Sequence, residues 1–350
     1  MSTVMSTEIA EQPEALARTL EALLPLRADI RSLARGRHWV LFVARGSSDN
    51  AAVYGRYLLE THAGVRASLA APSVGTHYAA ELDLRDALVV SISQSGETSE
   101  IVATQEWART HGARTIAVTN DAASSLASSA NLALTTVAGV ERAVPATKTY
   151  TTQLAAMAVL GTALGQGEQA LDRELWRVPE EMARLISDRR GIDEAISLLA
   201  ESKDILVSGR GMLMGTALEV SLKLEETCLR PVRGLSYADL RHGPIAVVSN
   251  NLIAVLVSAS DGPMLDGMRR LAEDLRARQI GATIGIGGGT LLAELCDVAI
   301  PGPQLVEAVT PLAVIVPGQL IAEGLAIQLG LDPDSPRGLN KVTQTDQSAT

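Results

Sequence analysis

An internal repeat constrains the fold of this 350-residue chain more than any other feature of its sequence. The stretch WVLFVARGSSDNAAVYGRYLLE is restated by DILVSGRGMLMGTALEVSLKLEE, 165 residues further on. Gly46 of the first Arg-Gly dipeptide aligns with Gly211 of the second, and Ser93 aligns with Ser258 at the same offset. Two independent landmarks at one offset indicate two copies of one structural unit.

Each copy alternates apolar strand-like runs with helical stretches. In the first copy HWVLFVA, ALVVSIS and ARTIAVTN predict strands, and helical spacing follows the first two. Apolar strands separated by helices predict a parallel sheet covered on both faces. We therefore expect an α/β protein of two tandem flavodoxin-like units, with Gly46 and Gly211 at equivalent positions. The predicted parts are an N-terminal helical segment 1–29, a first unit 30–165, a helical connector 166–199, a second unit 200–335 and a C-terminal tail 336–350.

Composition excludes several classes of partner. The formal net charge is -10 and the chain has only one Phe, so nucleic acid and anionic membrane surfaces are not expected partners. No run of about 18 apolar residues and no secretory leader is apparent, which favours a cytoplasmic protein. Cys228 and Cys296 lie far apart without metal-ligand spacing. We expect them to be buried, reduced side chains, and we expect neither a metal nor a cofactor.

Lysine is rare, because only four of the 30 basic residues are lysines. Lysine, unlike arginine, can lose its proton and form an imine with a carbonyl group. A chain that otherwise uses arginine can retain lysine where an amine is needed, although chance survival on the surface is the simpler explanation. The four are Lys148, Lys203, Lys223 and Lys341.

The turn SISQSGETSE, from Ser91 to Glu100, joins a predicted strand to a predicted helix. In a parallel α/β sheet, ligands bind beyond the carboxyl ends of the strands, and a helix N-terminus attracts anions. Small hydroxyl residues and Gly96 there suit a phosphate on a small molecule. The spacing of a P-loop is absent, so a nucleoside triphosphate is not expected. The second copy reads GRGMLMG at its first turn, which has no hydroxyl, so we expect that copy to lack the anion site.

A second group of polar residues lies in the second copy. Glu219, Lys223 and Glu226 are spaced to share one helical face, a pattern that by itself is typical of a solvated salt-bridge ladder. His242, in LRHGPIAVV, is expected at a rigid turn before an apolar strand. A lone histidine there is more often structural than catalytic. The tail DPDSPRGLNKVTQT has little core to fill, yet it carries Lys341.

Six motifs in order now give a resemblance over nearly the whole chain. ARGSSDNA, SISQSGETSEI, VPATKTYTTQL, ALEVSLKLEET, LRHGPIAVV and PRGLNKVTQT resemble the tandem sugar isomerase (SIS) domain family. Within that family the chain is similar to the isomerase half of glucosamine-6-phosphate synthase and to SIS-type glucosamine-6-phosphate deaminases. No amidotransferase domain and no cysteine after the initiator Met are present in the sequence, so glutaminase activity is not expected.

The resemblance implies roles for individual residues. Glu226 matches the carrier of a proton between C1 and C2, and His242 matches the ring-opening acid/base that the synthase takes from a neighbouring subunit. Lys341 matches the lysine that meets the open-chain carbonyl, and Lys223 matches a lysine beside the sugar hydroxyls. The implied phosphate ligands are Ser48, Ser93, Gln94, Ser95 and Thr98, and the implied sugar-site residues are Val144, Thr147 and Glu219.

The implied activity is conversion of a 2-amino-aldose 6-phosphate to a ketose phosphate and ammonia. Glucosamine 6-phosphate is the expected substrate, and a homodimer with its site at the subunit interface is the expected assembly. A fructosamine-6-phosphate deglycase, another sugar phosphate isomerase, and a non-catalytic sugar-phosphate sensor are the alternatives. Four residues depart from the family pattern, namely Pro145, Asp239, Gly338 and Asn340. We expect these departures to affect which sugar is bound more than the reaction chemistry.

Overall fold

The computed structural model describes residues 2–165, 168–342 and 344, and these residues form two compact units. The first unit comprises Glu14–Glu141, Lys148–Trp176 and the chain from Asn340 onward. The second unit comprises the chain up to Pro13, Arg142–Thr147 and Arg177–Leu339. Each unit therefore combines segments that are distant in the sequence. Residues 166–167 of the predicted connector, and 343 and 345–350 of the predicted tail, lie outside the described residues.

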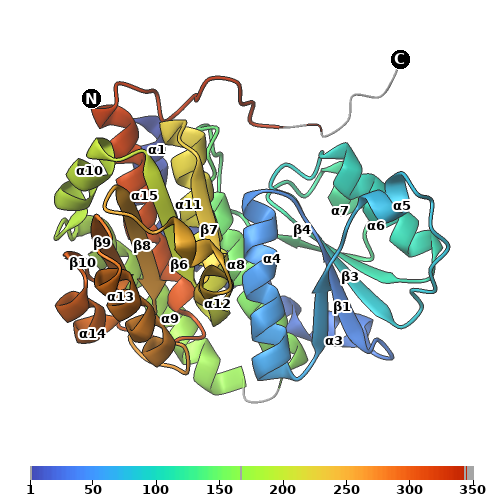
Figure 1. Ribbon diagram of the computed structural model, residues 1–350. Coiled ribbons are helices and arrows are strands. Elements are labelled where there is room, and N and C mark those ends of the chain that lie inside the picture. The colour runs from blue at the N-terminus through green and yellow to red at the C-terminus, as the bar shows by residue number, and fades with distance from the viewer. Residues whose placement is uncertain (1, 166–167, 343, 345–350) are drawn as a thin grey trace. The chain divides into compact units, whose positions relative to one another are not determined.

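The first unit is built on a five-stranded parallel sheet (Figure 1). Its strand order is β2-β1-β3-β4-β5, with bounds β1 Trp39–Val43, β2 Arg66–Leu69, β3 Ala87–Ile92, β4 Arg114–Thr119 and β5 Leu132–Thr135. The helices α3, α4 and α8 pack together beside this sheet, whereas α5, α6 and α7 form a separate group. Their bounds are α3 Arg27–Ala34, α4 Ser47–Leu58, α5 Ser73–Thr76, α6 Ser99–Thr110, α7 Ser125–Ser129 and α8 Lys148–Leu164.

The second unit is also built on a five-stranded parallel sheet. Its strand order is β10-β9-β8-β6-β7, with bounds β6 Asp204–Gly209, β7 Val232–Ser236, β8 Leu252–Ser258, β9 Ala282–Gly287 and β10 Val298–Ile300. The helices α10, α11 and α15 form one packed group, and α12, α13 and α14 form another. Their bounds are α10 Ile192–Glu201, α11 Met214–Cys228, α12 Tyr237–Arg241, α13 Leu265–Ala277, α14 Gly289–Leu295 and α15 Thr310–Gln328. The remaining α-helices are α1 Val4–Ala10, α2 Gln12–Leu23 and α9 Glu168–Ser187.

The two sheets have the same topology. Counted from the first strand of each unit, both follow the order 2-1-3-4-5, which is the flavodoxin-like order. Gly46 and Gly211 follow the first strand of their units, and both have φ near +60°, a conformation that glycine adopts readily. The prediction of two tandem flavodoxin-like units with parallel sheets is therefore confirmed.

Two local predictions need correction. First, the edge strand β2 was not predicted, because its sequence RASL is half-exposed and lacks an apolar run. Second, the residues after His242 and Gly243 do not form the expected strand. Pro244–Val247 is a short 3-10 helix, and β8 begins only at Leu252. A proline fixes φ in the helical range, and this position suits the first turn of a helix.

Two long apolar helices belong to the cores of their own units. Among the described residues only α15 is long and apolar enough to cross a membrane, but 83% of its apolar window is buried, and it packs against α10 and α11. In α8 the side chains are buried from Lys148 to Ala163, and the helix packs against α3 and α4. Packing within the first unit therefore accounts for the apolar character of α8.

Candidate active site

The predicted phosphate turn lies where β3 ends and α6 begins. The Ser93 hydroxyl accepts a hydrogen bond from the Gly96 N–H at 3.2 Å and lies 3.3 Å from the Thr98 hydroxyl. Gly96 has φ +66°, and a Cβ built there would lie 2.2 Å from the Ser124 hydroxyl, so the turn requires glycine. The Ser95 hydroxyl accepts the Glu97 N–H at 3.2 Å. The turn is thus held in shape by its own serines.

The same turn presents unsatisfied donors. Among the described residues, the backbone N–H groups of Gln94, Ser95 and Thr98 have no hydrogen-bond partner. Ser48, in the first turn of α4, lies at the same edge of the sheet, because β1 and β3 pair with Val43 opposite Ser91. Free N–H groups at a helix N-terminus, with hydroxyls beside them, form an anion-binding nest. Hereafter "the nest" means Ser48, Ser93, Gln94, Ser95 and Thr98.

The C-terminal tail contacts the residues beside the nest. The Gln344 side-chain carbonyl accepts hydrogen bonds from the Ser99 N–H at 3.0 Å and the Ser99 hydroxyl at 2.7 Å. Its amide donates to the Glu97 carbonyl oxygen at 3.2 Å. Gln344 therefore contacts the first turn of α6. The sequence contains no signal that could have predicted this contact.

Lys341 of the tail has a buried partner in the first unit. Its amine lies 2.7 Å from Oε2 of Glu141, a carboxylate whose side chain is fully buried. Glu141 also accepts the Thr149 N–H at 3.1 Å and the Thr149 hydroxyl at 2.6 Å, in the first turn of α8. Nearby, the buried Lys148 donates to the Val140 carbonyl at 2.6 Å. Sequence reasoning identified Lys341 but missed Glu141.

The second unit holds the predicted carboxylate–lysine face of α11. The Lys223 amine lies 3.5 Å from Glu219 Oε1 and 2.5 Å from Glu226 Oε2. The side chains of Lys223 and Glu219 are fully buried, and that of Glu226 is 24% exposed. These residues share one face, as their spacing predicts, but they do not form a solvated ladder. They form a buried charge cluster with one carboxylate open to solvent.

The other predicted site residues of the second unit differ in exposure and in hydrogen bonding. His242 is exposed, it follows α12, and its imidazole makes no hydrogen bond or ion pair in the described part of the chain. The Val144 N–H donates to the Asp334 carbonyl at 2.8 Å, and Thr147 is fully buried. No hydrogen bond or ion pair joins His242 to α11 within the residues that the structure describes.

Comparison with known proteins gives the family. Residues 34–163 match the SIS domain model. Glutamine–fructose-6-phosphate aminotransferase from Thermococcus kodakarensis is 36% identical over 96% of this chain and 57% of its own length. The C-terminal domain of glucosamine-fructose-6-phosphate aminotransferase from Francisella tularensis is 26% identical, with a TM-score of 0.88 over 96% of this chain and 99% of that one. This chain belongs to the SIS domain family.

Two further comparisons limit what the family assignment says about activity. The glucosamine-6-phosphate deaminase structure from Thermotoga maritima has a TM-score of 0.77 over 98% of this chain and 100% of that one, but at 24% identity the likeness concerns the fold. The chain spans little more than half the length of the aminotransferases that it matches.

The two copies of the SIS unit differ in charge at equivalent turns. In the second unit the Glu307 carboxylate lies beside Gly262, where an added Cβ would be 2.4 Å from Oε2 of Glu307. Burial raises the pKa of Glu307, and the nearby Asp261 raises it further. An acidic group at this edge disfavours a phosphate. That the second SIS unit lacks the anion site stays a prediction.

The described residues contain no group of three or more His, Cys, Asp or Glu side chains that could hold a metal ion. Both cysteines are free and buried.

Proposed function

We propose that this SIS protein is a sugar phosphate isomerase that acts on a 2-amino-aldose 6-phosphate and releases ammonia. Glucosamine 6-phosphate is the substrate that the sequence resemblance favours. The observation that carries the proposal is the buried Glu219–Lys223–Glu226 cluster. Burial of the Lys223 amine and the Glu219 carboxylate carries a desolvation cost of several kcal/mol per ion. A fold that keeps such a cluster with one carboxylate exposed is suited to proton transfer.

The nest has the donors to hold the substrate phosphate. Its hydroxyls and free N–H groups suit a dianion, and they lie at the carboxyl edge of the first sheet, where α/β folds bind ligands. Binding of this non-reacting group holds the open-chain sugar in place for the chemical steps.

The reaction then proceeds by proton transfers. His242 opens the sugar ring by moving a proton to the ring oxygen, which leaves an aldehyde at C1 and the amine at C2. Glu226 removes the C2 proton to give an enolamine and delivers a proton to C1, which yields a ketose imine. Water adds to C2, the C–N bond breaks, and ammonia leaves with a ketose phosphate as the second product. General acid–base transfer of this kind typically contributes ~10²–10⁴-fold.

Lys223 and Lys341 have separate roles in the proposal. The Lys223 amine lies 2.5 Å from the Glu226 carboxylate, and in the proposal it positions that carboxylate for the two proton transfers. The Lys341 amine meets the open-chain carbonyl, and Glu141 positions that amine through its 2.7 Å contact. Glu141 is itself fixed by the first turn of α8, where a carboxylate is also favoured by the helix dipole.

A product assay, together with a measurement of binding and C2 exchange, separates the deaminase, the deglycase and the sensor. Ammonia release and ketose phosphate formation should be assayed across glucosamine 6-phosphate, galactosamine 6-phosphate and fructosamine 6-phosphates. Ammonia from the first two supports the deaminase, whereas release of the amine from fructosamine 6-phosphates alone supports a deglycase. Binding of all three sugars without any turnover, and without exchange of the C2 hydrogen with solvent, would support a sensor and overturn the proposed activity.

We also propose a homodimer and a cytoplasmic location. His242 is exposed, and its imidazole makes no hydrogen bond or ion pair within the described residues, which suits a group that serves the site of a neighbouring subunit. Light scattering at micromolar concentration tests the dimer. Mixing of a Glu226→Gln protein with a His242→Ala protein tests the shared site, because recovered activity requires the two residues to come from different chains.

A further inference from the structure

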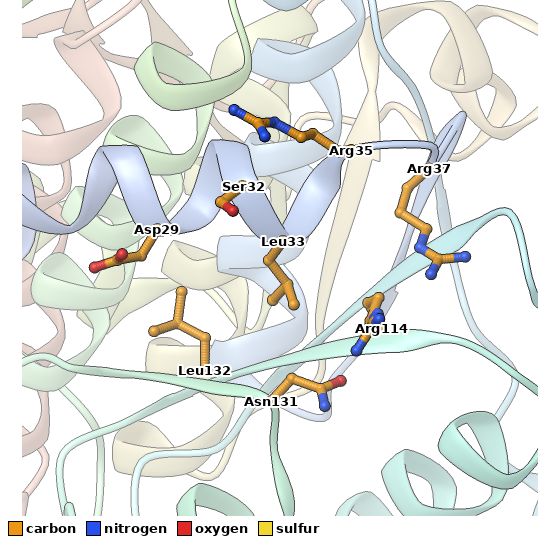
Figure 2. A pocket seen from close by; sticks show the side chains of 8 residues that line it. All are labelled: Asp29, Ser32, Leu33, Arg35, Arg37, Arg114, Asn131 and Leu132. Carbon is orange, nitrogen blue, oxygen red and sulfur yellow. The ribbon is translucent and has the colours of Figure 1, made fainter.

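A cavity lies at the opposite edge of the first unit's sheet from the nest. It has a volume of about 590 Å³, within the range of small-molecule sites. Figure 2 shows the eight side chains that line it, which come from α3, the loop between α3 and β1, the start of β4, and the start of β5 with the residue before it. These residues are Asp29, Ser32, Leu33, Arg35, Arg37, Arg114, Asn131 and Leu132.

The position of the cavity separates it from the proposed phosphate site. Arg114 is the first residue of β4, and Thr119, the last, donates a hydrogen bond to the Gln94 carbonyl within the nest. Six residues of extended chain span roughly 15–20 Å. A ligand in this cavity would therefore not compete directly for the nest.

The cavity concentrates positive charge in an acidic protein. Arg35, Arg37 and Arg114 make no side-chain hydrogen bond or ion pair within the described residues. The Nε atom of Arg37 is buried and has no hydrogen-bond partner there. Figure 2 shows Arg37 and Arg114 on the same side as Asn131, whereas the Arg35 guanidinium points away from them. A buried donor that the protein leaves unpaired usually has a partner that comes from outside it.

Asn131 adds oriented donors to the pair of arginines. Its side-chain oxygen accepts hydrogen bonds from the Thr115 N–H at 2.9 Å and the Thr115 hydroxyl at 3.2 Å. Both lone pairs are thereby occupied, so the amide presents its N–H₂ group as a donor. Two guanidinium groups and one amide, all donors, suit the acceptor oxygens of an oxyanion.

We propose that this cavity, named the arginine cavity, binds the phosphate of a small phosphorylated molecule. Arg37, Arg114 and Asn131 bind the phosphate oxygens. Leu33 and Leu132 contact the carbon skeleton, and Asp29, at the other end of the cavity, accepts a hydrogen bond from a hydroxyl group. This inference does not depend on the proposed enzymatic activity.

The test uses calorimetric titration of the full chain in a low-salt buffer free of phosphate. Glycerol 3-phosphate is the probe, and inorganic phosphate is titrated separately to find out whether the carbon skeleton contributes. The nest is first disabled with Ser93→Ala and Ser95→Ala, so that the arginine cavity accounts for the binding that remains. In that background we expect one equivalent of probe to bind per chain, more tightly than inorganic phosphate.

The cavity is then altered with Arg37→Ala and Arg114→Ala together. Charge-assisted hydrogen bonds predict weakening of about 10-fold or more for each guanidinium lost. The matched control is Arg66→Ala with Arg109→Ala, which removes equal charge from exposed arginines of the same unit that do not line the cavity. The melting temperature without ligand monitors folding of each variant.

The expected result is loss of binding in the cavity variant and unchanged binding in the control. Equal weakening in both variants would show non-specific attraction and would overturn the proposal. Undiminished binding in the cavity variant, or no binding of either anion in the nest-disabled protein, would also overturn it. If only inorganic phosphate binds, the site is an anion site without selectivity for an organic ester, which contradicts the stated ligand class.

Discussion

Replacement of Glu226 by Gln is the sharpest test of the proposed chemistry. The change keeps the size of the side chain and removes its capacity to accept a proton at neutral pH. If Glu226 carries the proton between C2 and C1, kcat should fall by roughly 10²-fold or more, while KM changes little. The same change should stop exchange of the C2 hydrogen with deuterated solvent, which NMR measures directly.

The structural consequences of this substitution can be worked out separately. The Lys223 amine lies 2.5 Å from the Glu226 carboxylate, and a glutamine oxygen can still accept that hydrogen bond. Glu219 remains 3.5 Å away, so the buried cation keeps one charged partner. We therefore expect the free energy of unfolding to fall by only ~1–3 kcal/mol, far less than loss of the cluster would cost. A thermal melt checks this expectation.

The control is Glu225→Gln on the same helix. Glu225 is exposed, and its carboxylate accepts the Val232 N–H at 3.3 Å, away from Lys223. This variant should keep both kcat and the rate of C2 exchange. If Glu226→Gln exchanges the C2 hydrogen at the wild-type rate, another group carries the proton and the assignment is wrong.

Three further predictions follow from the geometry. Gly96→Ala should lower stability by at least ~2 kcal/mol more than Gly64→Ala, because both have φ near +65° but only Gly96 faces a hydroxyl at 2.2 Å; equal losses contradict this. Glu141→Gln should lower kcat about 10-fold with KM retained, because Lys341 loses its charged anchor; an unchanged kcat removes that role. Burial raises the pKa of Cys296 to about 11, so native protein at pH 8 should resist thiol labelling; rapid labelling would show an accessible thiolate.

Much of the fold could be predicted from local sequence. The repeat offset and the apolar runs indicated β1, β3, β4, β6, β8 and β9, because strands buried on both faces must be apolar throughout. The edge strand β2 was not predictable in the same way. Its residues are partly exposed, and the hydrogen bonds of a neighbouring strand hold it in the sheet. The residues after His242 were predicted as a strand but form a 3-10 helix, because their apolar sequence is compatible with either structure.

The features of the candidate site likewise fall into two groups, those predictable from local sequence and those set by tertiary packing. The sequence by itself determined that Glu219, Lys223 and Glu226 share a helical face and that a hydroxyl-rich turn precedes α6, since both follow from spacing within one element. Only the tertiary structure decided that the α11 cluster is buried, that Lys341 meets Glu141 from 200 residues away, and that Arg37 and Arg114 line one cavity. Burial and long-range contacts depend on how elements pack against one another, and the spacing of residues within one element does not contain that information.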